Sequence, residues 1–189
     1  MRYLILLLLM IGFANAGDNT INIDQVGDNN TINITQDGSG HTANVEIGKD
    51  LSSSGNTVNI TQQDLGIKTA TVEIKSGVDN GINILQQGTG NHTASILNLH
   101  GSGNSIDVNQ SGAGNHSFGI TNTPGTTNSG NTIGATQLGG SGADKSFALT
   151  LGGTTGANVT VQQTNPTQAN SGSMSIQCTT CGNYSYIRY

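Results

Sequence analysis

Residues 80–86 read Asn-Gly-Ile-Asn-Ile-Leu-Gln, and this seven-residue pattern decides the fold because it recurs along the chain. An Asn opens the pattern, two apolar residues alternate with polar ones, and a Gln closes it. Alternation with period two and abundant Ile, Val and Thr residues predict a β-strand for each copy. The other copies, some of them weaker, begin at Asn19, Asn30, Asn56, Asn104, Asn131 and Ala157.

A second alternating pattern lies between copies of the first, as in His-Thr-Ala-Asn-Val-Glu-Ile at residues 41–47. Its other copies begin at Lys68, His92, His116, Lys145 and, with a poorer match, Gly172. Joints such as Gly-Thr-Gly and Gly-Ala-Gly predict tight corners, because Gly adopts positive φ at little cost. The patterns form strand-turn-strand units that begin near residues 30, 56, 80, 104, 131 and 157, with a half unit at residues 19–25.

A two-strand unit cannot bury its own apolar face, so the units must stack on one another. We therefore expect an all-β chain, a β-solenoid of about six strand-turn-strand repeats with cross-β, amyloid-like stacking. Equivalent residues then form ladders, and a buried amide is satisfied by its copies above and below. The expected ladder and polymerisation residues are Asn30, Ile32, Ile34, Gln36, Asn56, Val58, Ile60, Gln62, Asn80, Ile82, Ile84, Gln86, Asn104, Ile106, Val108, Gln110, Asn131, Ile133 and Gln137.

Composition excludes several classes of protein. Only 9% of the residues are charged, 4% are aromatic and Trp is absent, which favours a thin core. A formal net charge of −5 without a Lys or Arg cluster argues against a nucleic-acid partner. Residues 1–16 predict a signal peptide, with Arg2, an apolar run and a small-x-small site ending at Ala16. The exported chain then begins at Gly17 and contains no transmembrane segment.

The repeat region is expected over residues 17–177 and a C-terminal tail over residues 178–189. Cys178 and Cys181 have C-x-x-C spacing, which in an exported chain favours a local disulfide over a redox motif or a zinc site. The tail alternates in polarity, so it is a candidate last strand that caps the solenoid or a segment that docks a partner. The candidate docking residues are Tyr184, Tyr186, Arg188 and Tyr189.

Two stretches, NGINILQQGTGNHTAS at residues 80–95 and NSIDVNQSGAGNHS at residues 104–117, resemble the curlin repeat of bacterial curli subunits. The resemblance covers nearly all of the chain after residue 16 and leaves open whether the subunit is major or nucleating. It implies an extracellular, pilus-like amyloid fibre on the cell surface, with roles in biofilm, adhesion and surface attachment. The implied partners are further copies of the chain, other curlin-like subunits and the outer-membrane secretion machinery. The second strands differ from the curlin pattern in closing on Ile47, Ile74, Asn98, Asn122 and Leu151 instead of Gln.

The opening position of the second pattern is His41, Lys68, His92, His116 or Lys145. One interpretation is a metal-binding column of imidazoles, and the favoured one is a basic, solvated corner. In the favoured interpretation, protonation below about pH 6 adds repulsion and slows assembly.

No catalytic residue, metal ligand or cofactor site is predicted. Glu46 and Glu73 occupy equivalent positions of neighbouring repeats, and the repeat explains them without a catalytic pair. The favoured function is thus a structural fibre subunit with no enzymatic activity. The alternative is a non-polymerising β-solenoid that binds a ligand or surface, as adhesins, phage fibres and ice-binding proteins do. Ice binding favours a regular array of Thr residues on one flat face. The outward Thr residues of the first pattern are replaced in the two copies that follow residues 57–61, which argues against ice binding.

Overall fold

A computed structural model describes residues 17–48, 51 and 53–189, and the predicted signal peptide lies outside this range. The described residues form fourteen β-strands and no helix. They therefore contain no helix long and apolar enough to cross a membrane. Each strand overlaps a copy of one of the two alternating patterns, apart from the last, which lies in the predicted tail. The copy placed at Gly172 was wrong by two residues, because Asn170 pairs with Lys145 and opens this strand. The expected all-β solenoid is confirmed.

The strands divide into two sheets by the parity of their number. The odd-strand sheet contains β1 (Thr20–Gln25), β3 (Thr42–Ile47), β5 (Lys68–Ser76), β7 (His92–His100), β9 (His116–Asn122), β11 (Lys145–Leu151) and β13 (Asn170–Ile176). The even-strand sheet contains β2 (Thr31–Gly38), β4 (Thr57–Asp64), β6 (Gly81–Gln87), β8 (Ser105–Gly112), β10 (Thr132–Gly139), β12 (Asn158–Gln163) and β14 (Asn183–Arg188).

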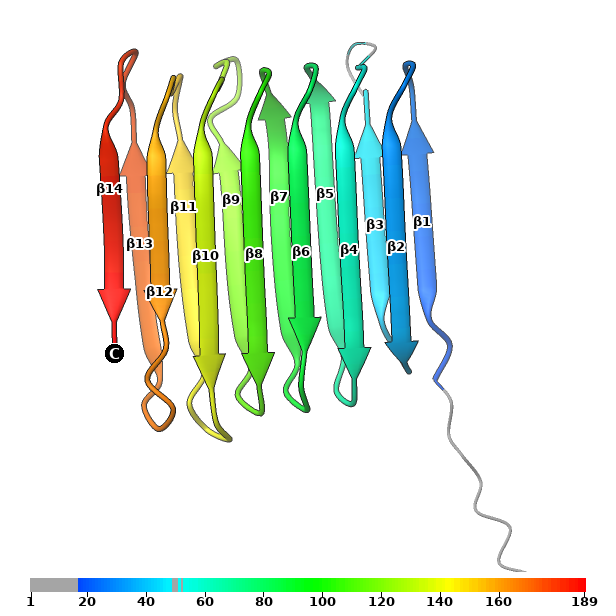
Figure 1. Cartoon of the computed structure of the whole chain (residues 1–189), viewed down its shortest axis with the longest axis vertical. Coiled ribbons are helices and arrows are strands. Elements are labelled where there is room, and N and C mark those ends of the chain that lie inside the picture. The colour runs from blue at the N-terminus through cyan, green and yellow to red at the C-terminus, as the bar shows by residue number, and fades with distance from the viewer. Residues whose placement is uncertain (1–16, 49–50, 52) are drawn as a thin grey trace, which may run out of the picture.

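Figure 1 shows the two sheets face to face, with β1 and β2 at one end of the stack and β13 and β14 at the other. The chain crosses from sheet to sheet at each corner, so one odd and one even strand make one turn, here called a rung. Every pairing within a sheet is parallel, for example Ile82 with Ile106 and Ile106 with Ile133. Because each sheet has seven strands, the solenoid has about seven turns. β1 and β2 make the first rung, and β13 and β14 make the last.

β1 belongs to the sheet that its sequence does not suggest. Its residues 19–25 follow the first pattern, yet β1 pairs with β3, a copy of the second pattern. Ile21 lies next to Ala43 and Ile23 next to Val45, so the apolar positions still match. Chain order decides the outcome, because β2 takes the even-strand position and the preceding strand must lie opposite it.

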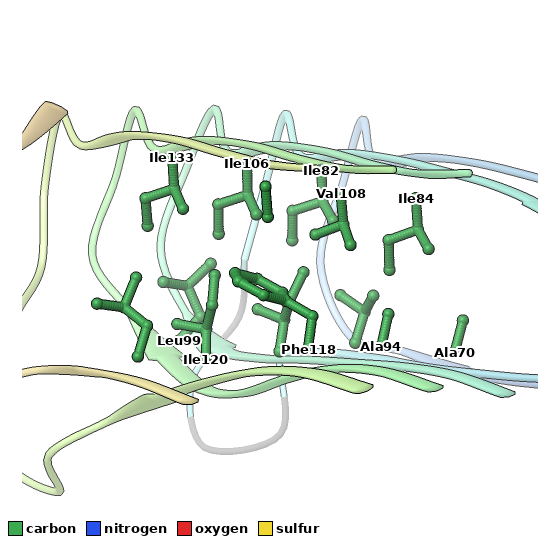
Figure 2. Close-up of a cluster of buried hydrophobic side chains, with 14 of the residues drawn as sticks. Ala70, Ile82, Ile84, Ala94, Leu99, Ile106, Val108, Phe118, Ile120 and Ile133 are labelled. Atoms are coloured by element: carbon green, nitrogen blue, oxygen red, sulfur yellow. The ribbon is translucent and has the colours of Figure 1, made fainter. Parts of the chain in front are cut away.

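The core is a single layer of apolar side chains between the two sheets (Figure 2). Ile82, Ile106 and Ile133 come from the even-strand sheet and face Ala94, Phe118 and Ile120 of the odd-strand sheet. These side chains are at most 1% exposed, whereas the residues between them along each strand are exposed or half-buried. Successive side chains of a strand point to opposite faces of the sheet, so every second residue points into the core and is apolar on each rung. This burial explains the period-two pattern of the sequence.

Glycine is required where successive corners approach closely. Gly88 and Gly112 have φ values of 96° and 110°, in the left-handed region. A Cβ added to Gly88 would lie 2.4 Å from the carbonyl oxygen of Gly112, and one added to Gly112 would lie 2.2 Å from that of Gly139. Any other residue would push the rungs apart at this corner.

One strand breaks the repeat register. Between β5 and β7, Val72 pairs with Ile96 but Ile74 pairs with Leu99, so β7 holds an extra residue. Asn98, at a φ of 56°, is therefore displaced, and the expectation that it closes the second pattern was wrong. Leu99 occupies that position and is 1% exposed.

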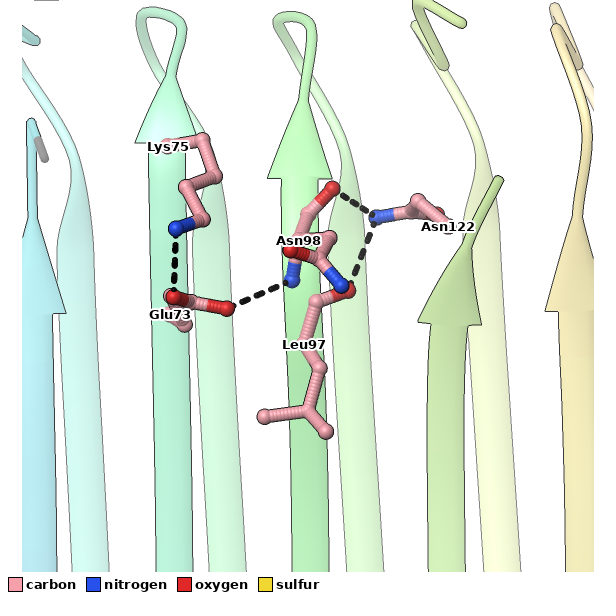
Figure 3. A network of polar contacts seen from close by, with 5 residues as sticks. All are labelled: Glu73, Lys75, Leu97, Asn98 and Asn122. Carbon is pink, nitrogen blue, oxygen red and sulfur yellow. Dashed lines mark hydrogen bonds and ion pairs between the residues drawn. The ribbon is translucent and has the colours of Figure 1, made fainter. Parts of the chain in front are cut away.

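Polar contacts hold this bulge in place (Figure 3). The Glu73 carboxylate accepts from the Asn98 backbone N–H at 3.1 Å and contacts Lys75 Nζ at 2.8 Å. On the next rung, Asn122 Nδ2 donates to the Asn98 carbonyl at 3.1 Å. Because Glu73 and Asn122 satisfy the backbone groups that the extra residue takes out of the ladder, the bulge is a fixed feature.

Candidate functional site: side-chain ladders and end surfaces

The opening Asn residues of the even-strand rungs form a hydrogen-bonded ladder. Each Asn donates from Nδ2 to Oδ1 of the Asn before it, at 2.8 to 2.9 Å. The same Nδ2 donates to a carbonyl oxygen of the next corner at 2.7 to 3.3 Å. Within this ladder, each buried amide is thus satisfied by its neighbours. The ladder comprises Asn30, Asn56, Asn80, Asn104 and Asn131.

The closing Gln residues form a second ladder with the opposite polarity. Each Gln before the last donates from Nε2 to Oε1 of the Gln after it, at 2.7 to 2.9 Å. Each also donates to a carbonyl oxygen of the odd-strand sheet, at 2.9 to 3.2 Å, which ties the two sheets together. The ladder runs through Gln36, Gln62, Gln86, Gln110, Gln137 and Gln163.

The apolar ladder residues lie between the two amide ladders. The column through Val58 and Ile82 pairs residue by residue across β2, β4, β6, β8 and β10, and so does the column through Ile60 and Ile84. The structure therefore brings together the expected ladder residues. Their part in polymerisation stays a prediction.

A third ladder runs along the outer face of the even-strand sheet, and sequence reasoning missed it. Asn33 Nδ2 donates to Asn59 at 2.8 Å, Asn59 donates to Asn83 at 2.7 Å, and Asn83 donates to Asp107 at 2.7 Å. The repetition of Asn at one outward position of the first pattern was the signal that could have revealed it. Surface amides thus reinforce the same register as the buried ones.

The His and Lys column is buried, so the expectation of a solvated corner was wrong. The five residues of this column are at most 2% exposed. The corner loops fold over these side chains, whose polar atoms reach backbone carbonyl oxygens instead of water. The column consists of His41, Lys68, His92, His116 and Lys145.

The imidazoles of this column are held in one orientation. Nε2 of His92 lies 2.8 Å from the Gln87 carbonyl oxygen, and Nε2 of His116 lies 2.9 Å from that of Ser111. A carbonyl accepts only, so Nε2 carries the proton and buried Nδ1 has no hydrogen-bond partner. The two rings stack with centroids 4.8 Å apart and nearly parallel planes, so their Nδ1 lone pairs point side by side and do not converge on one ion. No set of three His, Cys, Asp or Glu side chains within the described part of the chain could hold a metal ion.

Burial determines how these His residues titrate. It lowers the pKa of His92 to about 4, against the hydrogen bond to Gln87 and with a further contribution from neighbouring His116 and Lys68. Burial likewise lowers the pKa of His116, against its hydrogen bond to Ser111. The folded chain therefore resists protonation that the unfolded chain accepts at about pH 6.5.

Stability is expected to fall on acidification between about pH 6.5 and pH 4. The pKa of His92 is lower in the folded chain than in the unfolded chain. The contribution of His92 to folding stability is therefore complete above the unfolded-state pKa and is lost as pH falls toward the folded-state pKa. Between pH 7.5 and pH 4.5 we expect His92 to account for a loss of about 2 kcal/mol of unfolding free energy. Urea midpoints of wild type and His92→Asn at both pH values measure it. Equal losses in the two proteins would show that His92 is not responsible.

Lys68 is among the largest of the fully buried side chains. Its Nζ donates to the carbonyl oxygens of Leu65, Gly66, Gly88 and Gly90 at 2.6 to 3.1 Å, which joins the corners of two successive rungs. Burial lowers the pKa of Lys68, and the Asp64 carboxylate opposes this shift. Lys145 makes a similar contact with the carbonyl oxygens of Asn165 and Gln168.

Glu46 and Glu73 lie side by side on the outer face of the odd-strand sheet, as their repeat position predicts. Asp24 extends the row by one rung. Glu73 is engaged by Lys75 and the Asn98 backbone, which fits a structural position in the bulge.

The predicted tail is part of the stack. A disulfide joins Cys178 and Cys181 at the last corner, and β14 pairs with β12. The Cys181 N–H donates to the Thr155 carbonyl at 3.0 Å, which anchors this corner. The disulfide lies where the Asn ladder has stopped, since Ala157 and then Gly182 follow Asn131 at the ladder position.

Reduction of this disulfide should loosen the last rung alone. Closing so short a loop stabilises by about 2 kcal/mol in the chain-entropy model. We expect a reductant to accelerate amide exchange at residues 183–188, while β6 and β8 keep their protection. Hydrogen exchange with mass spectrometry measures both regions, and Cys178→Ser/Cys181→Ser with and without reductant is the control. Unchanged exchange at residues 183–188 would contradict the expectation.

Each end of the solenoid presents two strands with an unpaired edge. β1 and β2 bound the sheets at one end, and β13 and β14 bound them at the other. At the first end, Ile21 and Ile23 are 48% and 53% exposed although they occupy core positions. At the other end, Tyr184 and Tyr186 occupy core positions and are only partly buried. Within residues 17–48, 51 and 53–189, no further strand pairs with these four edges.

The fold and its ladders define a parallel, two-sheet β-solenoid with open ends. Residues 16–48, which include β1, β2 and β3, match the family model of the curlin associated repeat. This match supports the resemblance to curlin that the spacing of Gln and Gly indicates. No curated protein and no solved structure matches the chain.

Proposed function

We propose that this chain is the structural subunit of an extracellular curli-like amyloid fibre, formed when the last rung of one copy stacks on the first rung of the next. The open ends carry this proposal, because each presents unpaired backbone groups and core residues in the register of the internal rungs. An exposed parallel edge is a template for a further strand. In this role the chain acts mechanically and catalyses no reaction.

The two ladders explain how one interface serves both folding and assembly. Gln36 opens the Gln ladder and Asn30 the Asn ladder, so the first rung presents ladder side chains to a second copy. The last rung presents Gly182, Tyr184, Tyr186 and Arg188 at the equivalent positions. In this proposal the ladder residues act internally in the monomer, and those of β2 also act at the fibre junction. The proposal includes export to the cell surface, roles in biofilm and adhesion, and the secretion machinery and other curlin-like subunits as partners, and the curlin match supports it.

The test compares two substitutions on β2 that face opposite ways. Ile34→Lys places a charge at a core position of the first rung, whereas Thr35→Lys places the same charge on the outer face. We expect the chain from Gly17 to form dye-positive, unbranched fibres whose lag is shortened by preformed fibres. Ile34→Lys should stay a folded monomer, since burying an unpaired charge at the junction is costly. Thr35→Lys should form fibres.

A wild-type chain that stays a folded, dye-negative monomer would overturn the proposal. That result would favour the non-polymerising solenoid that binds a ligand or surface. Equal fibre formation by the two Lys variants would show that assembly does not use the edge of β2.

A further inference from the structure

The Gln ladder ends on a residue of different chemistry. In the even-strand sheet, Gln163 of β12 pairs with Arg188 of β14, so Arg188 occupies the next ladder position. A guanidinium group donates hydrogen bonds and cannot accept one. Gln163 Nε2 accordingly donates to the Ser146 and Asn170 carbonyl oxygens, at 3.0 and 3.2 Å, and not to the next rung.

The other end of the ladder presents the complementary group. Every ladder Gln after the first accepts at Oε1 from the Gln before it. Gln36 is the first, so its Oε1 accepts from no preceding Gln. A donor stacked on this end would therefore continue the ladder, and Arg188 is a donor at the opposite end.

We propose that Arg188 of one copy donates to Gln36 Oε1 of the next copy, and that this contact sets the polarity and register of the fibre junction. The proposal rests on the proposed function and specifies which residues meet. Continuing the internal register pairs β14 with β2 of the next copy: Tyr184 with Ile32, Tyr186 with Ile34, and Arg188 with Gln36. β13 then pairs with β1 of the next copy.

Charge favours the same polarity. The first rung, residues 17–40, contains Asp18, Asp24, Asp28 and Asp37 and no Lys or Arg. The last rung, residues 164–189, contains Arg188 and no Asp or Glu. Two first rungs would bring acidic surfaces together and two last rungs would bring Arg188 against its own copy, whereas first against last pairs opposite charges.

The last rung also prepares an apolar contact for the next copy. The Tyr186 hydroxyl donates to the Ser171 carbonyl oxygen at 2.7 Å, and the Tyr186 ring packs against Phe147 with centroids 4.8 Å apart. Gly172 leaves room for this ring, since a Cβ there would lie 2.4 Å from Tyr186 Cζ. Tyr186 is thereby fixed as a rigid, partly buried surface against which Ile34 of the next copy would pack.

The first test measures the critical monomer concentration of three position-188 proteins. Arg188→Gln continues the ladder and should stay within about twofold of wild type, because Gln also donates. Arg188→Glu sets an acceptor against Gln36 Oε1 and should raise the critical concentration at least about tenfold. Arg188→Glu/Gln36→Arg restores a donor and an acceptor in reversed order and should recover most of that loss. Wild-type fibres with no effect of Arg188→Glu, or no recovery in the double variant, would overturn this proposal and leave the proposed function standing.

The second test reads polarity and register directly. Ser185 of one copy would pair with Asn33 of the next on the outer face, at the strand spacing of about 4.8 Å that a disulfide can span. Fibres grown from mixed Ser185→Cys and Asn33→Cys chains should give mixed disulfide dimers on oxidation. Thr35→Cys in place of Asn33→Cys is the off-register control and should give far fewer. Asn33→Cys homodimers, or a higher yield with Thr35→Cys, would overturn the proposed junction, whereas absence of wild-type fibres would overturn the proposed function itself.

Discussion

Gln86→Ala should lower the free energy of unfolding by about 4 kcal/mol, since it removes a fully buried amide from the middle of the ladder. Gln86 accepts from Gln62 at 2.9 Å and donates to Gln110 at 2.8 Å and to the Thr69 carbonyl at 3.0 Å. The truncation leaves the Gln110 and Thr69 acceptors without this donor in a closed core. Each such buried, unsatisfied group costs about 1 to 3 kcal/mol.

The neighbouring Gln87 is the matched control. It lies on the same strand with its side chain on the half-exposed outer face. Gln87→Ala should cost less than about 0.5 kcal/mol, as is usual for surface substitutions. Urea unfolding of the monomer measures both variants.

Gln86→Glu separates the hydrogen bonds from the packing, because Glu has the same shape. A protonated Glu retains one donor for Gln110, whereas a carboxylate has none and carries a buried charge. Burial raises the folded pKa of the new carboxyl, so its cost relative to wild type should be small near pH 4 and grow as pH rises to about 7. A cost independent of pH, or an equal cost for Gln86→Ala and Gln87→Ala, would contradict the ladder as a source of stability.

Lys68→Met should be the second largest single-site loss, at about 3 to 4 kcal/mol. The substitution preserves much of the side-chain length but removes the ammonium group that binds four carbonyl oxygens. The carbonyl oxygens of two successive corners then face each other without the ammonium group that donates hydrogen bonds to both. The loss should be local, so amide exchange should rise most at residues 64–68 and 88–92.

Lys75→Met is the control for charge removal on the same strand. Lys75 contacts Glu73 near the surface, where an ion pair contributes less than about 1 kcal/mol. Unfolding midpoints together with regional hydrogen exchange distinguish the two positions. If Lys68→Met and Lys75→Met were equally destabilising, the buried carbonyl contacts of Lys68 would contribute nothing beyond its charge.

The sequence alone determined the strands, their order and the contents of the main columns. A parallel solenoid places each residue next to its own repeat equivalent, so alignment of the repeats is equivalent to a map of contacts. Ile82 next to Ile106, and Gln86 next to Gln110, follow from that rule without coordinates. The outer Asn33 ladder follows from the same rule.

Only the tertiary structure decided four features: the sheet to which β1 belongs, the register of β7, the burial of side chains under the corner loops and the orientation of the amides. The sheet of β1 follows from chain order and not from its pattern, and the Leu99 register follows from an extra residue in β7. The corner loops bury Lys68 and His92, which a sequence reading places in solvent because both side chains are polar. The opposed polarities of the Asn and Gln ladders depend on amide orientation. Side-chain type does not specify that orientation, which the surrounding carbonyl oxygens select by accepting from one side only.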